Sequence, residues 1–295
     1  MYILAGLFGA DVLPVAAPAH GEDVSAAESN ATFVTSLYDI GRERWPHFSR
    51  SYDSYLRRFS HLLAVEIPLV VFGERSLKPL VMQHRKGMTS PTRFVTRPFS
   101  LLPTWRHRLR VECVFDSRAF REDNDKLEHP ETFSADYLLL MHSKLPLLRH
   151  VMDRNPFNTS HFFWIDAGYA AVSDDDTISD VKKVNIPPGK QWRPESLLSL
   201  SHAVTYIQLN EPAQYVNVTQ LHKRRLSPAM AGGFFGGAQK VMTYYAALYN
   251  KCLLKQLTEG ELMEDQGTAL QVYFEHPSMF NLVKGDWFDA YRLFQ

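Results

Sequence analysis

Near the middle of the chain stands the run His161-Phe162-Phe163-Trp164-Ile165-Asp166-Ala167-Gly168. Its first five residues are mostly aromatic or apolar, which is typical of a short strand that is buried on both faces. A carboxylate follows at the end of this strand, and Gly168 leaves room for a ligand to approach the backbone. Open α/β sheets bind ligands at the carboxyl ends of their strands. The run therefore predicts a strand of a parallel sheet, with Asp166 either at the ligand-binding edge of the sheet or as the cap of the next turn.

Further strands and helices are expected on both sides of this run. Apolar alternation and continuous apolar stretches predict strands at 33–38, 67–72, 109–115, 203–209, 230–235 and 279–283. Helical spacing of apolar residues predicts helices at 51–63, 135–152, 239–257 and 263–274, with a kink or a new turn at Pro146. This alternation indicates one α/β domain whose mostly parallel central sheet carries helices on both faces.

The ends of the domain and one internal segment differ in composition from the rest. Residues 1–31 are expected to be a flexible N-terminal extension, and residues 32–295 the domain itself. The first twenty residues are apolar but contain no Lys or Arg, and Asp11 and Pro14 interrupt them. This pattern disfavours a secretory signal, so a cytoplasmic location is slightly favoured and a secretory compartment such as the Golgi lumen stays open. The polar stretch 173–192 predicts a surface excursion over a site.

Composition excludes several classes of protein. The chain has 295 residues, of which 45% are hydrophobic, and its 37 aromatic residues (19 Phe, 13 Tyr, 5 Trp) exclude disorder of the whole chain. Thirty-two basic residues balance 32 acidic ones, which argues against nucleic-acid binding. Two cysteines are too few for a disulfide scaffold or a Cys-rich zinc site. No apolar run of 18 residues is present, so no transmembrane segment is expected.

The remaining candidates for chemistry lie late in the chain, which lacks the common hydrolase, zincin, P-loop and dinucleotide signatures. Gly232-Gly233-Phe234-Phe235-Gly236-Gly237 either forms a tight turn or lets a ligand approach the backbone, with a Phe ring offered to a sugar or a base. Glu264-Asp265-Gln266 either caps a helix or supplies a general base at the rim of a cleft. His276, after that helix, is either structural or a metal ligand.

Together these segments resemble glycosyltransferases of the GT-A type, and more narrowly the HtrL/YibB family of sugar transferases. The resemblance covers about residues 32–287. It is carried by residues 34–42, the apolar strand ending in Val71-Phe72, the helix with Ser143-Lys144, residues 163–168 and residues 232–237.

The resemblance implies a Rossmann-related GT-A-like sheet and a set of ligand-binding residues. Those expected to hold the nucleotide sugar are Thr35, Asp39, Gly41, Arg42, Lys144, Asp166, Ala167, Gly168, Gly232, Gly233, Phe234 and Lys284. It also implies a divalent cation, Mn²⁺ or Mg²⁺, held by Asp166 with His276. Gly168 stands where a DxD motif would carry its second carboxylate. Positive charge from Arg42, Lys144 or Lys284 is therefore the alternative partner of the diphosphate.

The function implied by this resemblance is transfer of a sugar from a nucleotide sugar, expected to be UDP-linked, to a hydroxyl of a glycan or glycoconjugate. By analogy with the acidic pair of inverting members, Asp265 is the expected base, with Glu264 next, and inversion is the expected outcome. Two alternatives stay open. One is a non-catalytic nucleotide- or glycan-binding protein that keeps the fold. The other is a nucleotidyltransferase, although a basic, glycine-rich triphosphate loop is absent from the sequence.

Overall fold

A seven-stranded sheet forms the centre of the computed structural model, which describes residues 30–169, 192, 196–200 and 202–294. Its strand order is β3-β2-β1-β4-β6-β5-β7. The strands are β1 (Ala31–Leu37), β2 (Leu69–Gly73), β3 (Thr92–Thr96), β4 (His161–Ile165), β5 (Val204–Gln208), β6 (Met230–Ala238) and β7 (Phe280–Lys284). Of these described strands, β6 alone runs antiparallel to its neighbours. The expected mostly parallel sheet is confirmed.

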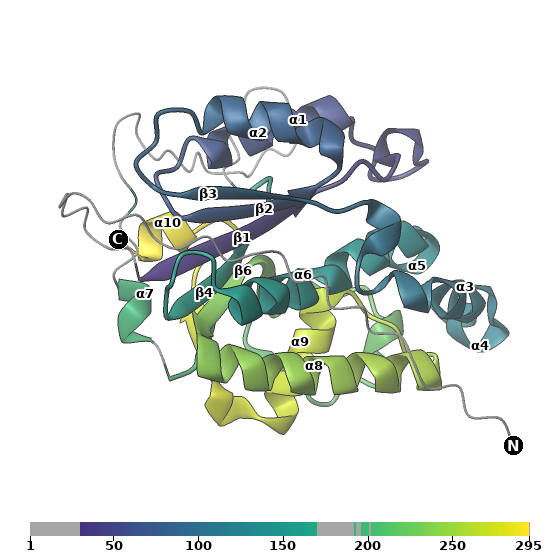
Figure 1. The fold of residues 1–295 in the computed structure, drawn as a ribbon. Helices are drawn as coiled ribbons and strands as arrows, with labels where there is room; N and C mark the ends of the chain where they lie inside the picture. Colours follow the sequence, from purple (N-terminus) through teal and green to yellow (C-terminus); the bar gives the residue numbers. More distant parts are fainter. Residues whose placement is uncertain (1–29, 170–191, 193–195, 201, 295) are drawn as a thin grey trace, which may run out of the picture.

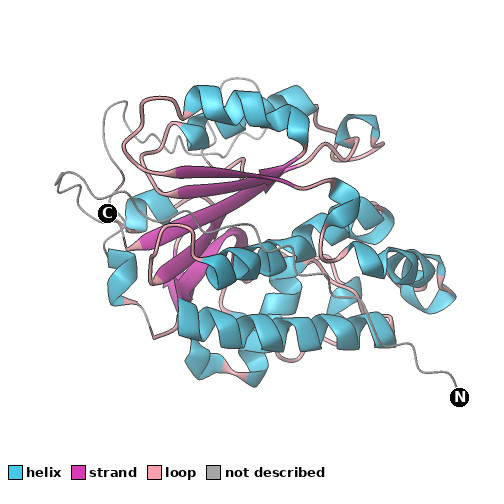
Figure 2. Cartoon of the chain, viewed as in Figure 1, coloured by secondary structure: helices cyan, strands magenta, loops and turns pink. Residues whose placement is uncertain are grey.

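Helices lie on both faces of this sheet, as expected. The longer ones are α1 (Tyr52–Leu63), α2 (Lys78–His84), α3 (Arg108–Asp116), α6 (Ala135–Arg154), α8 (Gln239–Glu259) and α9 (Asp265–Glu275). Short helices complete the set: α4 (Arg118–Arg121), α5 (Pro130–Phe133), α7 (Ser196–Ser199) and α10 (Ala290–Leu293). Helices α1 and α2 cover one face, and α6, α8 and α9 cover the other (Figure 1). The sheet is the middle of three layers (Figure 2).

Both faces of the sheet are apolar because successive side chains of a strand point to opposite sides. In β1, Phe33 packs in the core cluster that contains Phe59 of α1. Its neighbour Val34 packs in the second cluster, which contains Leu148 of α6. All four side chains are fully buried. Burying each such side chain contributes roughly 1.5–3 kcal/mol, so a central strand of this kind is held from both sides.

The pairing of β6 with β4 depends on glycine. Gly236 lies opposite Phe163, and a Cβ atom at position 236 would stand 2.3 Å from the carbonyl oxygen of Phe162. Only a residue without a side chain fits this contact. The glycine-rich segment is therefore part of a strand that continues to Ala238, beyond the expected end at residue 235.

Two elements differ from the sequence-based expectation. Residues 109–115 were expected to form a strand but belong to α3, in which Val111, Val114 and Phe115 are buried at helical spacing while Leu109 is largely exposed. Apolar residues at positions 111, 114 and 115 fit one face of a helix as well as they fit a short strand. The edge strand β3 was not predicted, because its sequence, Thr-Arg-Phe-Val-Thr, is short and largely polar.

The other expected elements agree with the structure within a few residues. Helix α6 continues through Pro146 without ending. Of the expected excursion at 173–192, residues 173–191 lie outside the described residues, as do residues 1–29 of the expected N-terminal extension. Trp192 is buried, and its indole N–H donates to the carbonyl oxygen of Phe294 at 2.6 Å. Within the described part of the chain, no helix combines the length and apolar character that crossing a membrane requires.

Candidate active site

The carboxyl end of β4 and the start of β6 meet at one edge of the sheet. The backbone N–H of Asp166 donates to the carbonyl oxygen of Gly233 at 2.8 Å. The carboxylate of Asp166 is held in place by the indole N–H of Trp164, which donates to its Oδ1 at 2.7 Å. Trp164 is itself buried in β4. Strand pairing therefore places Asp166 and the two glycines Gly232 and Gly233 side by side.

A buried lysine completes this edge. Lys144 projects from α6, and its Nζ lies 3.1 Å from Asp166 Oδ1 and 2.9 Å from Asp265 Oδ2. The same ammonium donates to the carbonyl oxygen of Gly232 at 3.0 Å. Burial lowers the pKa of Lys144, but the two carboxylates outweigh burial and raise the pKa above its ordinary value. Lys144 is therefore a permanent positive charge on the floor of the site.

Asp265 is the more buried of the two carboxylates that pair with Lys144. Its side chain is only 11% exposed, and a Cβ atom at position 232 would stand 2.9 Å from its Oδ2. Gly232 thus makes room for the carboxylate of Asp265. Burial first, and then the negative charge of Asp166, raise the pKa of Asp265 despite the attraction of Lys144. Three charged side chains here carry a net charge of −1 when both carboxylates are ionised.

The turn that carries Glu264 and Asp265 is anchored by a neutral histidine. Burial lowers the pKa of His142 to about 4, so its imidazole is uncharged at neutral pH. Its Nε2 lies 2.8 Å from the carbonyl oxygen of Met263, which can only accept. The Nε2–H therefore donates to Met263, and Nδ1 accepts from the hydroxyl of Tyr249 at 2.8 Å. This chain of bonds ties the start of α9 to α6 and α8.

Two adjoining cavities open above this floor. The inner cavity, about 250 Å³, is lined by Asp166, Lys144 and Gly233 and by the residues that follow β1, including Asp39. The outer cavity, about 1140 Å³, extends over the start of α9 and is lined by Glu264 and Gln266. The two cavities share one wall, which consists of Arg42, Arg50, Arg58, Tyr137, Trp287 and Phe288.

The shared wall is cationic. Arg42 donates to the hydroxyl of Tyr55 at 2.5 Å and to the carbonyl oxygen of Phe48 at 2.8 Å, and its guanidinium lies over the ring of Tyr137. Arg50 lies over the ring of Tyr55. Among the described residues, neither Arg42 nor Arg50 pairs with a carboxylate. Their charges are held in place by neutral partners and stay available to an anion.

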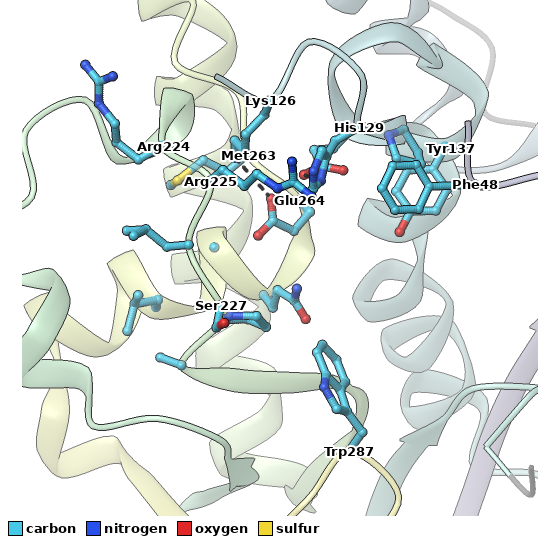
Figure 3. Close-up of a pocket in the computed structure, with 18 of the residues that line it drawn as sticks. Phe48, Lys126, His129, Tyr137, Arg224, Arg225, Ser227, Met263, Glu264 and Trp287 are labelled. Carbon is cyan, nitrogen blue, oxygen red and sulfur yellow. Dashed lines mark ion pairs between the residues drawn. The ribbon is translucent and has the colours of Figure 1, made fainter. Parts of the chain in front are cut away.

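Charged groups of both signs cluster in the outer cavity (Figure 3). Lys126 Nζ lies 3.7 Å from Glu264 Oε2, and this oxygen accepts no hydrogen bond from the described part of the chain. Glu131, from α5, lies near the same carboxylate. Burial first, and then the charge of Glu264, raise the pKa of Glu131 to about 7. Glu131 thus retains its proton to a higher pH than an ordinary glutamate does.

The structure brings most of the predicted site residues to these cavities. Those that line the inner cavity are Asp39, Arg42, Lys144, Asp166, Ala167, Gly168 and Gly233. Gly41 adopts a left-handed conformation (φ 68°), and its N–H donates to Asp39 Oδ1 at 2.9 Å, so it shapes the turn beneath Arg42. Gly232 accepts the bond from Lys144 described above.

Four predicted residues lie elsewhere. Thr35 is fully buried within β1, and Phe234 is fully buried against Phe163, because the register of both strands turns these side chains into the core. Lys284 pairs with Glu211 on the surface at 2.5 Å, at the end of edge strand β7. His276 follows the C-terminus of α9. It is separated from Asp265 by eleven residues, or about 16 Å of helix.

The expected divalent cation does not fit the side chains around Asp166. His276 is too far away, and Gly168 supplies no second carboxylate. Both oxygens of Asp166 already accept from Lys144, and Oδ1 also accepts from Trp164. No group of three His, Cys, Asp or Glu side chains suited to a metal occurs in the described ranges. Mg²⁺ and Mn²⁺ prefer several oxygen ligands, and here the positive charge beside Asp166 is an ammonium.

The residues that reach the site from loops and short helices were not predicted from the sequence. Arg50, Glu131 and Trp287 stand in no motif, and nothing local in the sequence brings them together. Lys144 did carry a signal beyond resemblance, because it falls on the apolar stripe of its helix with Met141 and Leu148 three and four residues away. A lysine at such a position needs a buried partner.

The protein is an α/β domain whose mixed central sheet carries a charged pocket at the carboxyl ends of its strands. Residues 29–295 match the family described as "Bacterial protein of unknown function (HtrL_YibB)". The chain belongs to this HtrL/YibB family, as its sequence indicated. Protein HtrL of Escherichia coli (strain K12) is 25% identical over 288 residues, which cover 91% of this chain and 93% of HtrL.

A likeness is also found among solved structures. The crystal structure of mouse xyloside xylosyltransferase 1, in its apo form, superposes with a TM-score of 0.44. The match covers 85% of this chain and 84% of the mouse chain at 11% sequence identity. This distant likeness assigns no activity and no residue role to the chain.

Proposed function

We propose that this protein is a glycosyltransferase, which binds a nucleotide sugar in the inner cavity and transfers the sugar to a hydroxyl group in the outer cavity. The observation that carries the proposal is the buried Lys144, held between Asp166 and Asp265 at the ligand-binding edge of the sheet. The family resemblance of the segments around Asp166 and Gly232-Gly233 supplies the reaction class, and UDP is the proposed nucleotide.

The donor diphosphate is proposed to lie against the shared arginine wall. Arg42 and Arg50 face both cavities without a carboxylate partner among the described residues, and guanidinium groups bind phosphate oxygens in a bidentate manner. Asp166, which is 38% exposed, faces the inner cavity as an acceptor for a sugar or ribose hydroxyl. Arginine charge thus takes the role that a metal has in enzymes with a full DxD motif.

Glu264 is proposed as the acceptor-side base. Asp265 is held by Lys144 and lines neither cavity, whereas Glu264 lines the outer cavity, and its Oε2, 3.7 Å from Lys126 Nζ, accepts no hydrogen bond from the described residues. In the proposed step the acceptor hydroxyl oxygen attacks the anomeric carbon, the bond from that carbon to the diphosphate breaks, and the proton passes to Glu264. A displacement of this kind inverts the anomeric configuration. A positioned base accelerates proton transfer by about 10²–10⁴-fold.

The proposal is tested by offering UDP-, GDP- and dTDP-sugars and measuring release of the free nucleoside diphosphate. We expect one donor to be hydrolysed slowly by the wild-type chain. Asp166→Ala should abolish this release with its melting temperature retained. Arg118→Gln, a control on an exposed side chain, should leave it unchanged. Full activity of Asp166→Ala would contradict the site, and release of pyrophosphate would identify a nucleotidyltransferase instead.

A further inference from the structure

The outer cavity has a cationic side of its own, separate from the shared arginine wall. Arg225 lines it and makes no ion pair or side-chain hydrogen bond within the described ranges. Among the described residues, the guanidinium of Arg224 on the same side bonds only to uncharged groups, the carbonyl oxygen of Asp123 and the side-chain oxygen of Gln220, each at 3.3 Å. Lys126, the ion-pair partner of Glu264, lines the same cavity. Three cations therefore line the outer cavity and are absent from the wall of the inner cavity, where the donor is proposed to bind.

These cations are gathered around the proposed base. Figure 3 shows Lys126, His129 and Arg225 around Glu264, whereas Arg224 extends away from the group. Burial first, and then the charges of Arg225 and Lys126, lower the pKa of His129, which is therefore neutral at pH 7. The local sum is +1 from Lys126, Arg225 and ionised Glu264, and Arg224 raises it to +2. Glu131, whose pKa is raised to about 7, is about half ionised at pH 7 and offsets roughly half a unit charge, so this side of the cavity stays positive.

We infer that the acceptor is an anionic sugar, whose phosphate or carboxylate group is bound by Arg225 with help from Lys126. The inference rests on the proposed function, because that function identifies the occupant of the outer cavity as the acceptor. A guanidinium without a protein counter-charge binds such an oxyanion through two parallel hydrogen bonds. With its anionic group on Arg225, the acceptor presents its hydroxyl groups to Glu264, the neighbouring carboxylate. The anion therefore orients the acceptor for transfer.

A matched pair of arginines makes the inference testable without knowledge of the natural acceptor. The probes are glucose 6-phosphate, glucuronate and the uncharged methyl glucoside, and their binding to the full chain is measured by calorimetry at low salt without nucleotide. Arg225→Gln and Arg224→Gln remove the same charge from adjacent positions. Arg118→Gln is the control at an exposed arginine that lines neither cavity. Melting temperatures establish that each variant is folded.

We expect at least one charged probe to bind, while methyl glucoside does not. The tighter of glucose 6-phosphate and glucuronate identifies the anion. Arg225→Gln should weaken this probe by about tenfold, Arg224→Gln by less than about threefold, and Arg118→Gln not at all. Raising the salt concentration should weaken binding as well.

Three results would overturn the inference: binding of methyl glucoside as tight as that of the charged probes, equal effects of Arg225→Gln and Arg118→Gln, or displacement of the probe by UDP. Failure of the proposed function is separate, since it would show as absence of UDP binding and of donor hydrolysis while the charged probe still binds through Arg225.

Discussion

Glu131 makes folding stability depend on pH in a predictable way. Its side chain is 13% exposed, and burial together with Glu264 raises its pKa from 4.5 to about 7. The folded chain therefore binds this proton more tightly than the unfolded chain. The resulting stabilisation is fully present below about pH 4.5 and is lost as the pH rises through about 7. Glu131→Gln removes the titration and should abolish this loss.

The magnitude follows from the same values. A rise from 4.5 to about 7 corresponds to a ceiling of roughly 3.4 kcal/mol, at ~1.36 kcal/mol per pH unit. Between about pH 5 and about pH 8.5, roughly 2.5 kcal/mol of this ceiling is expressed, and partial exposure of the carboxylate reduces it to about 2 kcal/mol. Glu131→Gln should therefore gain about 2 kcal/mol of unfolding free energy over wild type on going from the lower to the higher pH.

Guanidinium chloride unfolding of both chains at the two pH values measures this difference. Glu259→Gln is the matched control, because Glu259 is exposed at the end of α8. Its unfolding free energy should follow that of wild type at both pH values. A pH-independent difference between Glu131→Gln and wild type would refute the argument. A loss at high pH would show that Lys126 stabilises ionised Glu131 more than burial destabilises it.

Three further predictions concern the floor of the site, the sheet and the N-terminal extension. Lys144→Met leaves two adjacent carboxylates without their cation and should lower the unfolding free energy by about 3–5 kcal/mol, measured by chemical denaturation at neutral pH. Adding Asp265→Asn should recover part of this loss. A double variant no more stable than the single one would contradict the ion-pair geometry. Gly236→Ala places a Cβ atom 2.3 Å from a carbonyl oxygen of β4 and should lower stability by about 3 kcal/mol or prevent folding, so an unchanged melting temperature would contradict the register of β4 and β6. Deletion of residues 1–28, which precede β1 and the family match, should retain cooperative thermal unfolding, and loss of the transition would move the domain boundary.

The sequence was most informative where one pattern determined both element and position. The run 161–168 predicted a buried strand and a carboxylate at the ligand edge, because an apolar strand of five residues has few alternatives and ends at the first charged residue. The helix at 135–152 was predicted from the helical spacing of its apolar residues. By contrast, residues 109–115 fit a strand and a helix equally well, and only packing against α6 and α8 selects the helix.

The site was predicted in part because its residues come from distant segments. Asp166 and Gly233 are neighbours through strand pairing, which the order of strands suggests. Phe234 was wrongly predicted to contact the ligand. Whether a strand side chain points into the core or into the site depends on the register of the strand, and a glycine-rich segment gives no pattern from which the register can be predicted. Arg50 and Arg225 reach the cavities from irregular segments, for which no periodicity exists.

Donor turnover by a lysine variant tests the central claim most directly. Nucleoside diphosphate release from the preferred nucleotide sugar should be at least about 100-fold slower for Lys144→Met/Asp265→Asn than for wild type, since the floor of the inner cavity loses its cation. Arg118→Gln should retain the wild-type rate. This loss is expected in a variant whose circular dichroism spectrum and cooperative melting show a folded chain. Wild-type turnover by the folded double variant would contradict the claim that the charged edge beside Asp166 is the donor site.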